Sequence, residues 1–305
     1  TLHAIAAGVS TRRYASTLPA VPEPHETASS SRSAVSRRFV ELSTAQVQQW
    51  LERPVPKDLI VVMIDGIYLG ERVILVALGI DAKGVKHVLG LREGASENAR
   101  VVKALLSDLI ARGLDADARR LWVIDGGKAL RSAIVEMFGA LAHIHRCQEH
   151  KRRNVMEHLP QAMQADTSRA MRKAWEARQA SLAKRRLEAL AGSLQAQHPG
   201  AASSLREGLD ETLTLQALGI TGALYRTLRT TNPIENLNGS IAHYTRNVRR
   251  WRDGEMVQRW VASALADTGT SRSSSSPASA CPCRPWRGKR RTPAAAAGAR
   301  RGIRS

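Results

Sequence analysis

Three apolar segments follow one another between Lys57 and Gly94, and short polar turns separate them. The first reads DLIVVMIDG, the second GERVILVALGID and the third GVKHVLGLREG. Aliphatic runs joined by tight turns predict three consecutive antiparallel strands, a β-meander. The next segment, Ser96–Leu114, has apolar residues at helical spacing after a serine. It predicts an amphipathic helix that is capped by Ser96.

Two more strands alternate with helices after this meander. The apolar run Leu121–Ile124 ends abruptly in Asp125-Gly126-Gly127, and a helical pattern follows it. A second run, Leu141–Arg146, is followed by another helix. The element order β-β-β-α-β-α-β-α predicts an α/β fold with a mixed sheet and helices packed on it.

The rest of the chain divides by composition. Residues 1–52 are polar and basic, and GVSTRRYA and SSSRSAVSRRFVEL predict two short helices, the second capped by a serine. Spacing alone leaves a DNA-binding helix-turn-helix and a flexible basic arm equally open. Residues 155–228 are strongly helical in composition and predict an all-helical insertion between two parts of the core, 57–154 and 229–267. Residues 268–305 are of low complexity and predict a disordered basic tail.

The net charge of the chain indicates which kind of partner it binds. The net charge is +19 with a pI near 11.0, which favours a polyanion, most simply double-stranded DNA. Some of the basic residues can equally belong to a solvated surface. The candidates for DNA contact are Arg37, Arg38, Lys151, Arg152, Arg153, Arg246, Arg249 and Arg250.

The cysteine content and the hydropathy of the chain bear on its cellular compartment. The three cysteines, Cys147, Cys281 and Cys283, form no disulfide framework and favour a reducing cytosol. The apolar stretch Leu59–Ile80 contains Asp65 and other charged residues, so we expect no membrane span. The expected location is cytoplasmic and associated with the nucleoid.

Two aspartates lie at the ends of apolar runs. Asp65-Gly66 can form a hairpin turn, but such a turn leaves too short a strand before the break at Gly70-Glu71, so a strand through Asp65 is favoured. Asp125 can shape the turn or cap the next helix. If their strands are neighbours, the two carboxylates repel each other unless a divalent cation lies between them. Oxygen ligands select Mg²⁺ or Mn²⁺.

Glu235 has a structural alternative. Asn232-Pro233-Ile234-Glu235 places an expected N-cap asparagine, a proline at the first helical position and a glutamate three residues after the cap, which is close to a capping box. On spacing alone this favours a structural role. Asn236 and Asn238 are also polar in these first turns, and Arg246 shares the helix face of Glu235.

Cys147-x-x-His150 is half of a zinc signature. No second pair follows at zinc-finger spacing, and Cys281 and Cys283 fall in the predicted tail. We therefore expect no structural zinc from this motif alone.

Four of these segments together resemble the Mutator-type transposases of bacterial insertion sequences: DLIVVMIDGIYLGERVILVALGID, LWVIDGGKALRSAI, RCQEHKRRNV and TTNPIENLNGSIAHYTRNVRRWRDG. The resemblance covers roughly Gly8–Ala266. It implies an RNase H-like core with helices on both faces of the sheet, a helical insertion before the last catalytic glutamate and an N-terminal helix-turn-helix. It implies a catalytic, metal-binding triad of Asp65, Asp125 and Glu235, with Cys147 and His150 near the site.

The chain departs from the family pattern at three places. The pattern extends upstream of Thr1, and after Ala266 the sequence changes to a Ser-, Pro-, Ala- and Arg-rich ending. We therefore expect a truncated copy with an aberrant C-terminus. The position seven residues after Glu235, basic in many members, is Ala242, and Arg246 one turn later is a candidate substitute.

The resemblance implies Mg²⁺- or Mn²⁺-dependent DNA cleavage and strand transfer by a homo-oligomer on DNA. The alternatives are an inactive remnant that only binds DNA and a structure-specific nuclease with the same core.

Overall fold

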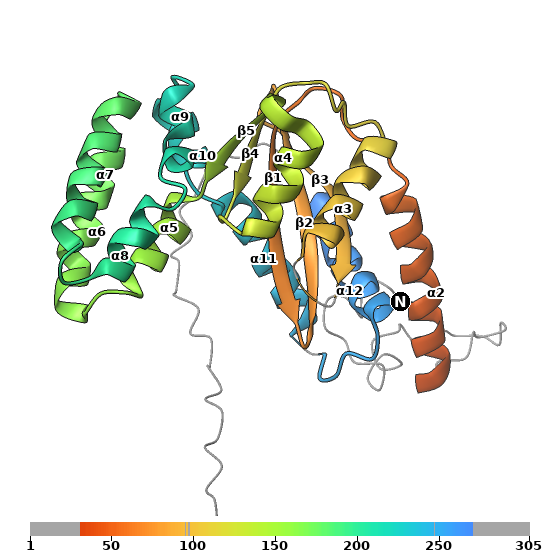
Figure 1. Cartoon of the computed structure of the whole chain (residues 1–305). Helices are drawn as coiled ribbons and strands as arrows, with labels where there is room; N and C mark the ends of the chain where they lie inside the picture. Colours follow the sequence, from red (N-terminus) through yellow and green to blue (C-terminus); the bar gives the residue numbers. More distant parts are fainter. Residues whose placement is uncertain (1–30, 95, 97, 247, 271–305) are drawn as a thin grey trace, which may run out of the picture. The chain divides into compact units, whose positions relative to one another are not determined.

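The computed structural model describes residues 31–94, 96, 98–246 and 248–270, with the backbone alone for residues 266–270. One mixed sheet has the strand order β3-β2-β1-β4-β5 (Figure 1). All five strands were predicted as apolar runs. Their bounds are β1 Leu59–Leu69, β2 Arg72–Asp81, β3 Lys86–Gly94, β4 Arg120–Ile124 and β5 Ala142–Arg146.

The meander is confirmed by the strand pairing. Strands β1, β2 and β3 pair antiparallel, while β4 pairs parallel with both β1 and β5. The turn between β1 and β2 lies at Gly70-Glu71, where Gly70 has a φ of 67° that favours glycine. Strand β1 continues through Asp65, which pairs with Val76, so the hairpin alternative at Asp65-Gly66 is wrong.

Helices cover both faces of this sheet (Figure 1). Alternate residues of a strand point to opposite faces, and Val62 and Ile64 pack with α3 (Ala99–Ala111) and α4 (Lys128–Phe138). Val61 and Met63 pack instead with α11 (Asn232–Thr245) and α12 (Gly254–Thr270). The strand order and the covered faces are consistent with an RNase H-like fold.

The N-terminal helix α2 runs without a break from Arg32 to Leu51. The sequence predicted a short helix that ends at Leu42, but the observed helix continues to Leu51. The helix is continuous because the Ser43 hydroxyl is buried and donates to the Phe39 carbonyl at 2.6 Å instead of capping a new helix. Ser31 is the capping serine, since its hydroxyl accepts from the Ala34 N–H at 3.3 Å.

Helix α2 packs against α12, and the rings of Phe39 and Trp260 lie 5.0 Å apart. The first predicted helix, residues 8–15, lies outside the described residues. The helix-turn-helix therefore stays a prediction.

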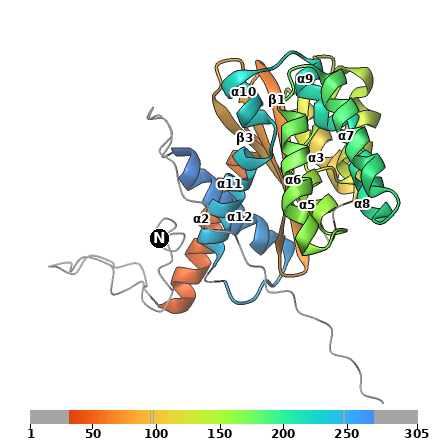
Figure 2. The same ribbon diagram turned by 90° about the vertical axis from the view of Figure 1, so that its left-hand side faces the viewer.

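Helices α5 to α10 connect β5 to α11. The helices α6, α7 and α8 lie side by side (Figure 2) and enclose a core of their own around Met171, Trp175, Leu187 and Leu205. The interpretation of residues 155–228 as an insertion stays a prediction. The bounds are α5 Gln148–Met156, α6 Gln161–Trp175, α7 Ala180–Leu194, α8 Pro199–Arg206, α9 Thr214–Ala217 and α10 Gly222–Leu228, with 3-10 turns at Gly139–Leu141 (η2) and Asp210–Leu213 (η3).

Two helices begin differently from the prediction. Helix α3 is capped by Asn98, whose side chain accepts from the Val101 N–H at 3.1 Å, and Ser96 instead contacts the Asn98 amide. The N-cap residue of α11 is Thr231, one residue before the predicted Asn232. Within the described residues, none of the helices combines the length and apolar character needed to cross a bilayer.

Candidate active site

The sheet brings the two predicted aspartates onto neighbouring strands. In the parallel pair β1 and β4, Ile64 lies opposite Ile124, and the next residues along the chain are Asp65 and Asp125. Asp65 follows Met63 by two residues and so projects toward the face that α11 covers. Asp125 follows Val123 in the same way. The two carboxylates therefore share one edge and one face of the sheet.

Helix α11 supplies the third carboxylate to the same face. Its Ile234 and Ile241 are buried in the core beneath it. Asn238, three residues after Glu235, donates from its amide Nδ2 to Asp65 Oδ2 at 2.7 Å. Because residues three apart share a helix face, this bond brings the Glu235 side of α11 to Asp65.

The Glu235 side chain is oriented by the residue that begins α11. The Thr231 hydroxyl donates to Glu235 Oε1 at 2.7 Å, and the Glu235 backbone N–H donates to the Thr231 carbonyl at 2.9 Å. The predicted capping box with Asn232 is therefore wrong, since the carboxylate bonds the hydroxyl of Thr231. Neither the role of Thr231 nor the contact of Asn238 with Asp65 was predicted from the sequence. Thr231 is four residues before Glu235 and Asn238 is three residues after it, and this helical spacing could have indicated that both lie on the same face of the helix as Glu235.

Negative charge accumulates at this site. Burial raises the pKa of Asp65 to about 6, and the nearby charges of Asp125 and Glu235 add to the rise. His150 and the Gly66 N–H oppose it. Asp125 and Glu235 are therefore both close enough to Asp65 to influence its pKa.

Asp125 also shapes its own loop. Its Oδ1 accepts from the Gly127 N–H at 2.8 Å, which is the turn-forming role considered from the sequence. Gly126 between them has a φ of 106°, and a Cβ there would lie 2.0 Å from Nε of the buried Arg146. The loop thus needs glycine at this position.

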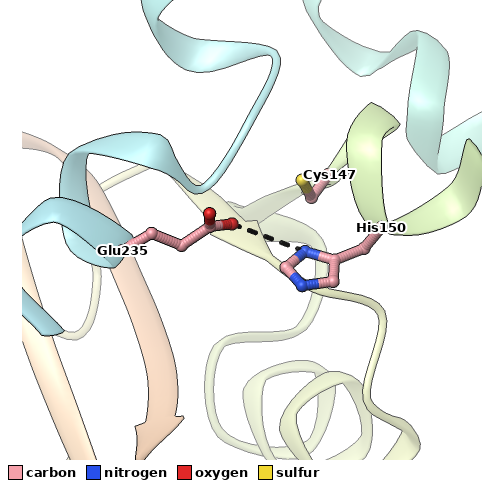
Figure 3. Close-up of side chains that lie close together, drawn as sticks. All are labelled: Cys147, His150 and Glu235. Atoms are coloured by element: carbon pink, nitrogen blue, oxygen red, sulfur yellow. Dashed lines mark ion pairs between the residues drawn. The ribbon is translucent and has the colours of Figure 1, made fainter. Parts of the chain in front are cut away.

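Cys147 and His150 lie beside the triad. The Cys147 N–H donates to the Ile124 carbonyl at 2.8 Å, next to Asp125 in the chain, and its buried Sγ accepts from the Thr231 backbone N–H at 3.4 Å. The Nδ1 atom of His150 lies 3.9 Å from Glu235 Oε1 (Figure 3). The motif therefore lies beside Glu235, and His150 approaches its carboxylate directly.

These two side chains alter each other's protonation. The hydrogen bond to Cys147 and the charges of that thiolate, Asp125 and Glu235 raise the pKa of His150 to about 9, although burial opposes this. Burial by itself would raise the pKa of the Cys147 thiol, but the interactions with His150 and Thr231 lower it below its ordinary value.

The predicted DNA contacts differ in exposure. Lys151 is fully buried, and its ammonium donates to the carbonyls of Ser204 at 2.6 Å and Glu207 at 2.5 Å, so in this structure it anchors α8 and faces no solvent. Arg152 is partly buried and pairs with Glu149 at 2.8 Å. The exposed candidates are Arg37, Arg38, Arg153, Arg246, Arg249 and Arg250.

The three carboxylates have the donor chemistry of a divalent-cation site. They offer hard oxygen donors, and the pKa of Asp65, which is raised by burial and further by Asp125 and Glu235, indicates that a neutralising charge is favoured there. Such donors suit Mg²⁺ or Mn²⁺.

Comparison with known proteins identifies the family. The model of the family "Transposase, Mutator family" matches residues 1–272. The chain therefore belongs to the Mutator family of transposases, as the resemblance implied.

Individual relatives are insertion-sequence transposases. The chain is 30% identical over 172 residues to the transposase for IST2 of Acidithiobacillus ferrooxidans, covering 56% of this chain and 57% of that one. It is 29% identical over 269 residues to the transposase for ISRM5 of Rhizobium meliloti, covering 86% and 65%. It is 28% identical over 268 residues to the transposase for IS406 of Burkholderia multivorans, covering 85% and 67%. The chain thus spans between about half and two thirds of the length of these relatives.

Proposed function

We propose that this chain carries the catalytic centre of a DDE transposase, which cleaves DNA at the ends of an insertion sequence and joins the freed end to new DNA. Asp65, Asp125 and Glu235 are the proposed catalytic and metal-binding residues. The family membership supports transposition as the process. The contact that supports the triad most directly is the hydrogen bond from Asn238 to Asp65, because it joins α11 to the sheet edge where both aspartates lie.

A pair of Mg²⁺ or Mn²⁺ ions, when bound, supplies Lewis-acid activation of the attacking water or 3′-OH and neutralises charge on the phosphodiester and the leaving oxygen. The chain's own residues fix where the carboxylates stand. Asn238 restricts the rotation of Asp65, Thr231 that of Glu235, and Gly127 that of Asp125. The donors are thus oriented before DNA binds.

The exposed arginines provide the affinity for DNA in this proposal. Arg249 and Arg250 follow α11, close in sequence to the helix that carries Glu235, and Arg37 and Arg38 lie on the exposed side of α2. Guanidinium groups hold phosphates without reading base sequence. We further propose that the protein acts as a homo-oligomer that brings two element ends together.

A cleavage and joining assay tests this function. The full chain is incubated with a duplex that carries the inverted repeats flanking its coding sequence, with a supercoiled target plasmid and with Mg²⁺ or Mn²⁺. We expect strand cleavage at the repeat end and covalent joining to the plasmid. Binding of the duplex without metal-dependent cleavage contradicts the proposal and assigns the chain to an inactive DNA-binding remnant. Cleavage without joining assigns it to a nuclease.

Asn238→Ala is expected to reduce the cleavage rate by roughly 10- to 100-fold, the usual effect of removing a partner that orients a metal ligand. The loss occurs because Asp65 no longer receives the amide hydrogen bond. Single-turnover cleavage at several Mg²⁺ concentrations measures it. Asn236→Ala, which changes an exposed asparagine on the same helix, is the matched control. Equal rates for the two variants contradict a positioning role for Asn238.

A further inference from the structure

A third potential metal ligand, Glu235, lies beside the Cys147-x-x-His150 motif in the fold. Cys147 Sγ, the Nδ1 or Nε2 atom of His150 and a carboxylate oxygen of Glu235 all lie within 4.8 Å of one another. Figure 3 shows the Glu235 carboxylate pointing from α11 toward the start of α5, where the other two residues lie. Zinc-finger spacing does not reveal this group, because Glu235 is far from the motif in sequence.

The three donors lie close together around the Thr231 hydroxyl. The Thr231 hydroxyl is 3.4 Å from Cys147 Sγ, 3.3 Å from His150 Nδ1 and 2.7 Å from Glu235 Oε1. His150 Nδ1 is 3.9 Å from Glu235 Oε1. A tetrahedral zinc with bonds of about 2.0–2.3 Å separates its donors by roughly 3.3–3.8 Å. Small side-chain shifts therefore bring these atoms to zinc-binding distances.

The donor types select the metal. A thiolate and an imidazole favour Zn²⁺ over Mg²⁺, which prefers oxygen ligands alone. The group is also accessible from one side: the Cys147 thiol is buried, while the side chains of His150 and Glu235 are 27% and 31% exposed. A zinc ion can therefore enter past His150 and Glu235 and reach the thiol.

We propose that Cys147, His150 and Glu235 form a zinc site, with the fourth position open to water. The zinc site and the proposed magnesium centre have Glu235 in common, and their other ligands differ. Zinc bound here occupies Glu235 Oε1 and competes with the aspartate centre for that carboxylate. Zinc binding rests on geometry alone, whereas its effect on DNA cleavage also rests on the proposed function.

Binding of Co²⁺ and Zn²⁺ to the full, metal-stripped chain tests the site. We expect Co²⁺ to give the absorption of thiolate-bound, tetrahedral cobalt and Zn²⁺ to displace it at one equivalent. Cys147→Ser and His150→Ala are each expected to weaken zinc binding by at least about 100-fold, since a lost ligand costs more than the 10- to 100-fold of a lost supporting residue. If Cys147→Ser does not fold, His150→Ala, at a partly exposed position, carries the test.

Two controls locate the metal. The double variant Cys281→Ser/Cys283→Ser removes the other two thiols of the chain, and His158→Ala removes an exposed imidazole; both are expected to bind zinc like the wild type. Loss of binding in the Cys281→Ser/Cys283→Ser variant, or unchanged binding in the Cys147→Ser and His150→Ala variants, overturns the proposal.

Asp65→Asn separates this inference from the proposed function, since it is expected to retain zinc binding while losing Mg²⁺-dependent cleavage. Zinc binding in a chain that never cleaves DNA leaves the zinc site supported and contradicts the transposase mechanism. Cleavage that zinc leaves unchanged at saturating occupancy overturns the competition for Glu235.

Discussion

Asp65→Asn is expected to reduce Mg²⁺-dependent strand cleavage by on the order of 10³-fold or more. The substitution keeps the size of the side chain and its bond from Asn238 but removes the negative charge that a cation requires. Metal-assisted charge stabilisation contributes several kcal/mol to the transition state, and about 4 kcal/mol corresponds to a factor of 10³. Single-turnover cleavage of the repeat-end duplex measures the effect, and DNA binding measured in the same buffer is expected to stay within about twofold of the wild type because phosphate contacts come from the arginines.

The same substitution is expected to stabilise the folded protein at pH 7. The pKa of Asp65 is about 6 in the folded state, above the ordinary value of 3.8, so the folded protein binds more protons between these values. Its stability therefore falls as the pH rises through this range, and ionised Asp65 is destabilising at pH 7. Removing the charge relieves this by on the order of 1–3 kcal/mol. Urea unfolding at pH 7 measures the gain.

Asp58→Asn is the matched control for both measurements, because Asp58 is an exposed aspartate just before the same strand. It is expected to change neither cleavage nor stability appreciably. An Asp65→Asn variant that cleaves at the wild-type rate removes Asp65 from the catalytic centre. If Asp65→Asn loses cleavage but is no more stable than the wild type, the inference that the buried, ionised carboxylate destabilises the folded protein is wrong.

The sheet was predictable because its signals are local. The strands are apolar runs separated by turn residues, and the distance from Asp65 to the break at Gly70-Glu71 favoured a continuing strand over the competing hairpin. From the sequence, the two carboxylates meet if the strands that carry Asp65 and Asp125 are neighbours, but the sequence alone could not establish that they are. The parallel pairing of β1 with β4 meets that condition.

Contacts between remote segments were not predictable in this way. Lys151 belongs to a run of three basic residues that predicts a phosphate-binding surface. It is buried instead, and its ammonium donates to the carbonyls of Ser204 and Glu207, which are remote in sequence. Thr231 likewise looks like an ordinary residue before a helix. Its hydroxyl lies close to Cys147, His150 and Glu235 only because the starts of α5 and α11 are adjacent in the fold. Single-sequence patterns carry no signal for such contacts.

Gly126→Ala is expected to lower the free energy of unfolding by roughly 3–5 kcal/mol, the combined cost of a strained backbone and an overpacked interior. Gly126 has a φ of 106°, and an added Cβ would lie 2.0 Å from Nε of Arg146. The guanidinium cannot easily withdraw, because it is buried and bonds Glu207, and its Nη1 lies against Gly208 on the other side. A fall in the melting temperature of roughly 10 °C follows from this cost.

The alanine also disturbs the loop that carries Asp125, so the Gly126→Ala protein that remains folded is expected to cleave DNA more slowly. Gly192→Ala is the matched control. Gly192 lies in helix α7, and an added Cβ there meets no atom within 4 Å, so alanine is expected to stabilise the chain by about 0.5–1 kcal/mol. If the free energy of unfolding falls in Gly126→Ala and rises in Gly192→Ala, the loss comes from the local geometry at residue 126 and not from a general effect of alanine.

A double variant identifies which part of the cost is steric. In Gly126→Ala/Arg146→Ala the clash with the guanidinium is gone, while the backbone strain at residue 126 persists. The double variant is therefore expected to be more stable than the sum of the two single effects predicts, by on the order of 1–3 kcal/mol. Strict additivity contradicts the clash and leaves the positive φ as the sole origin of the loss.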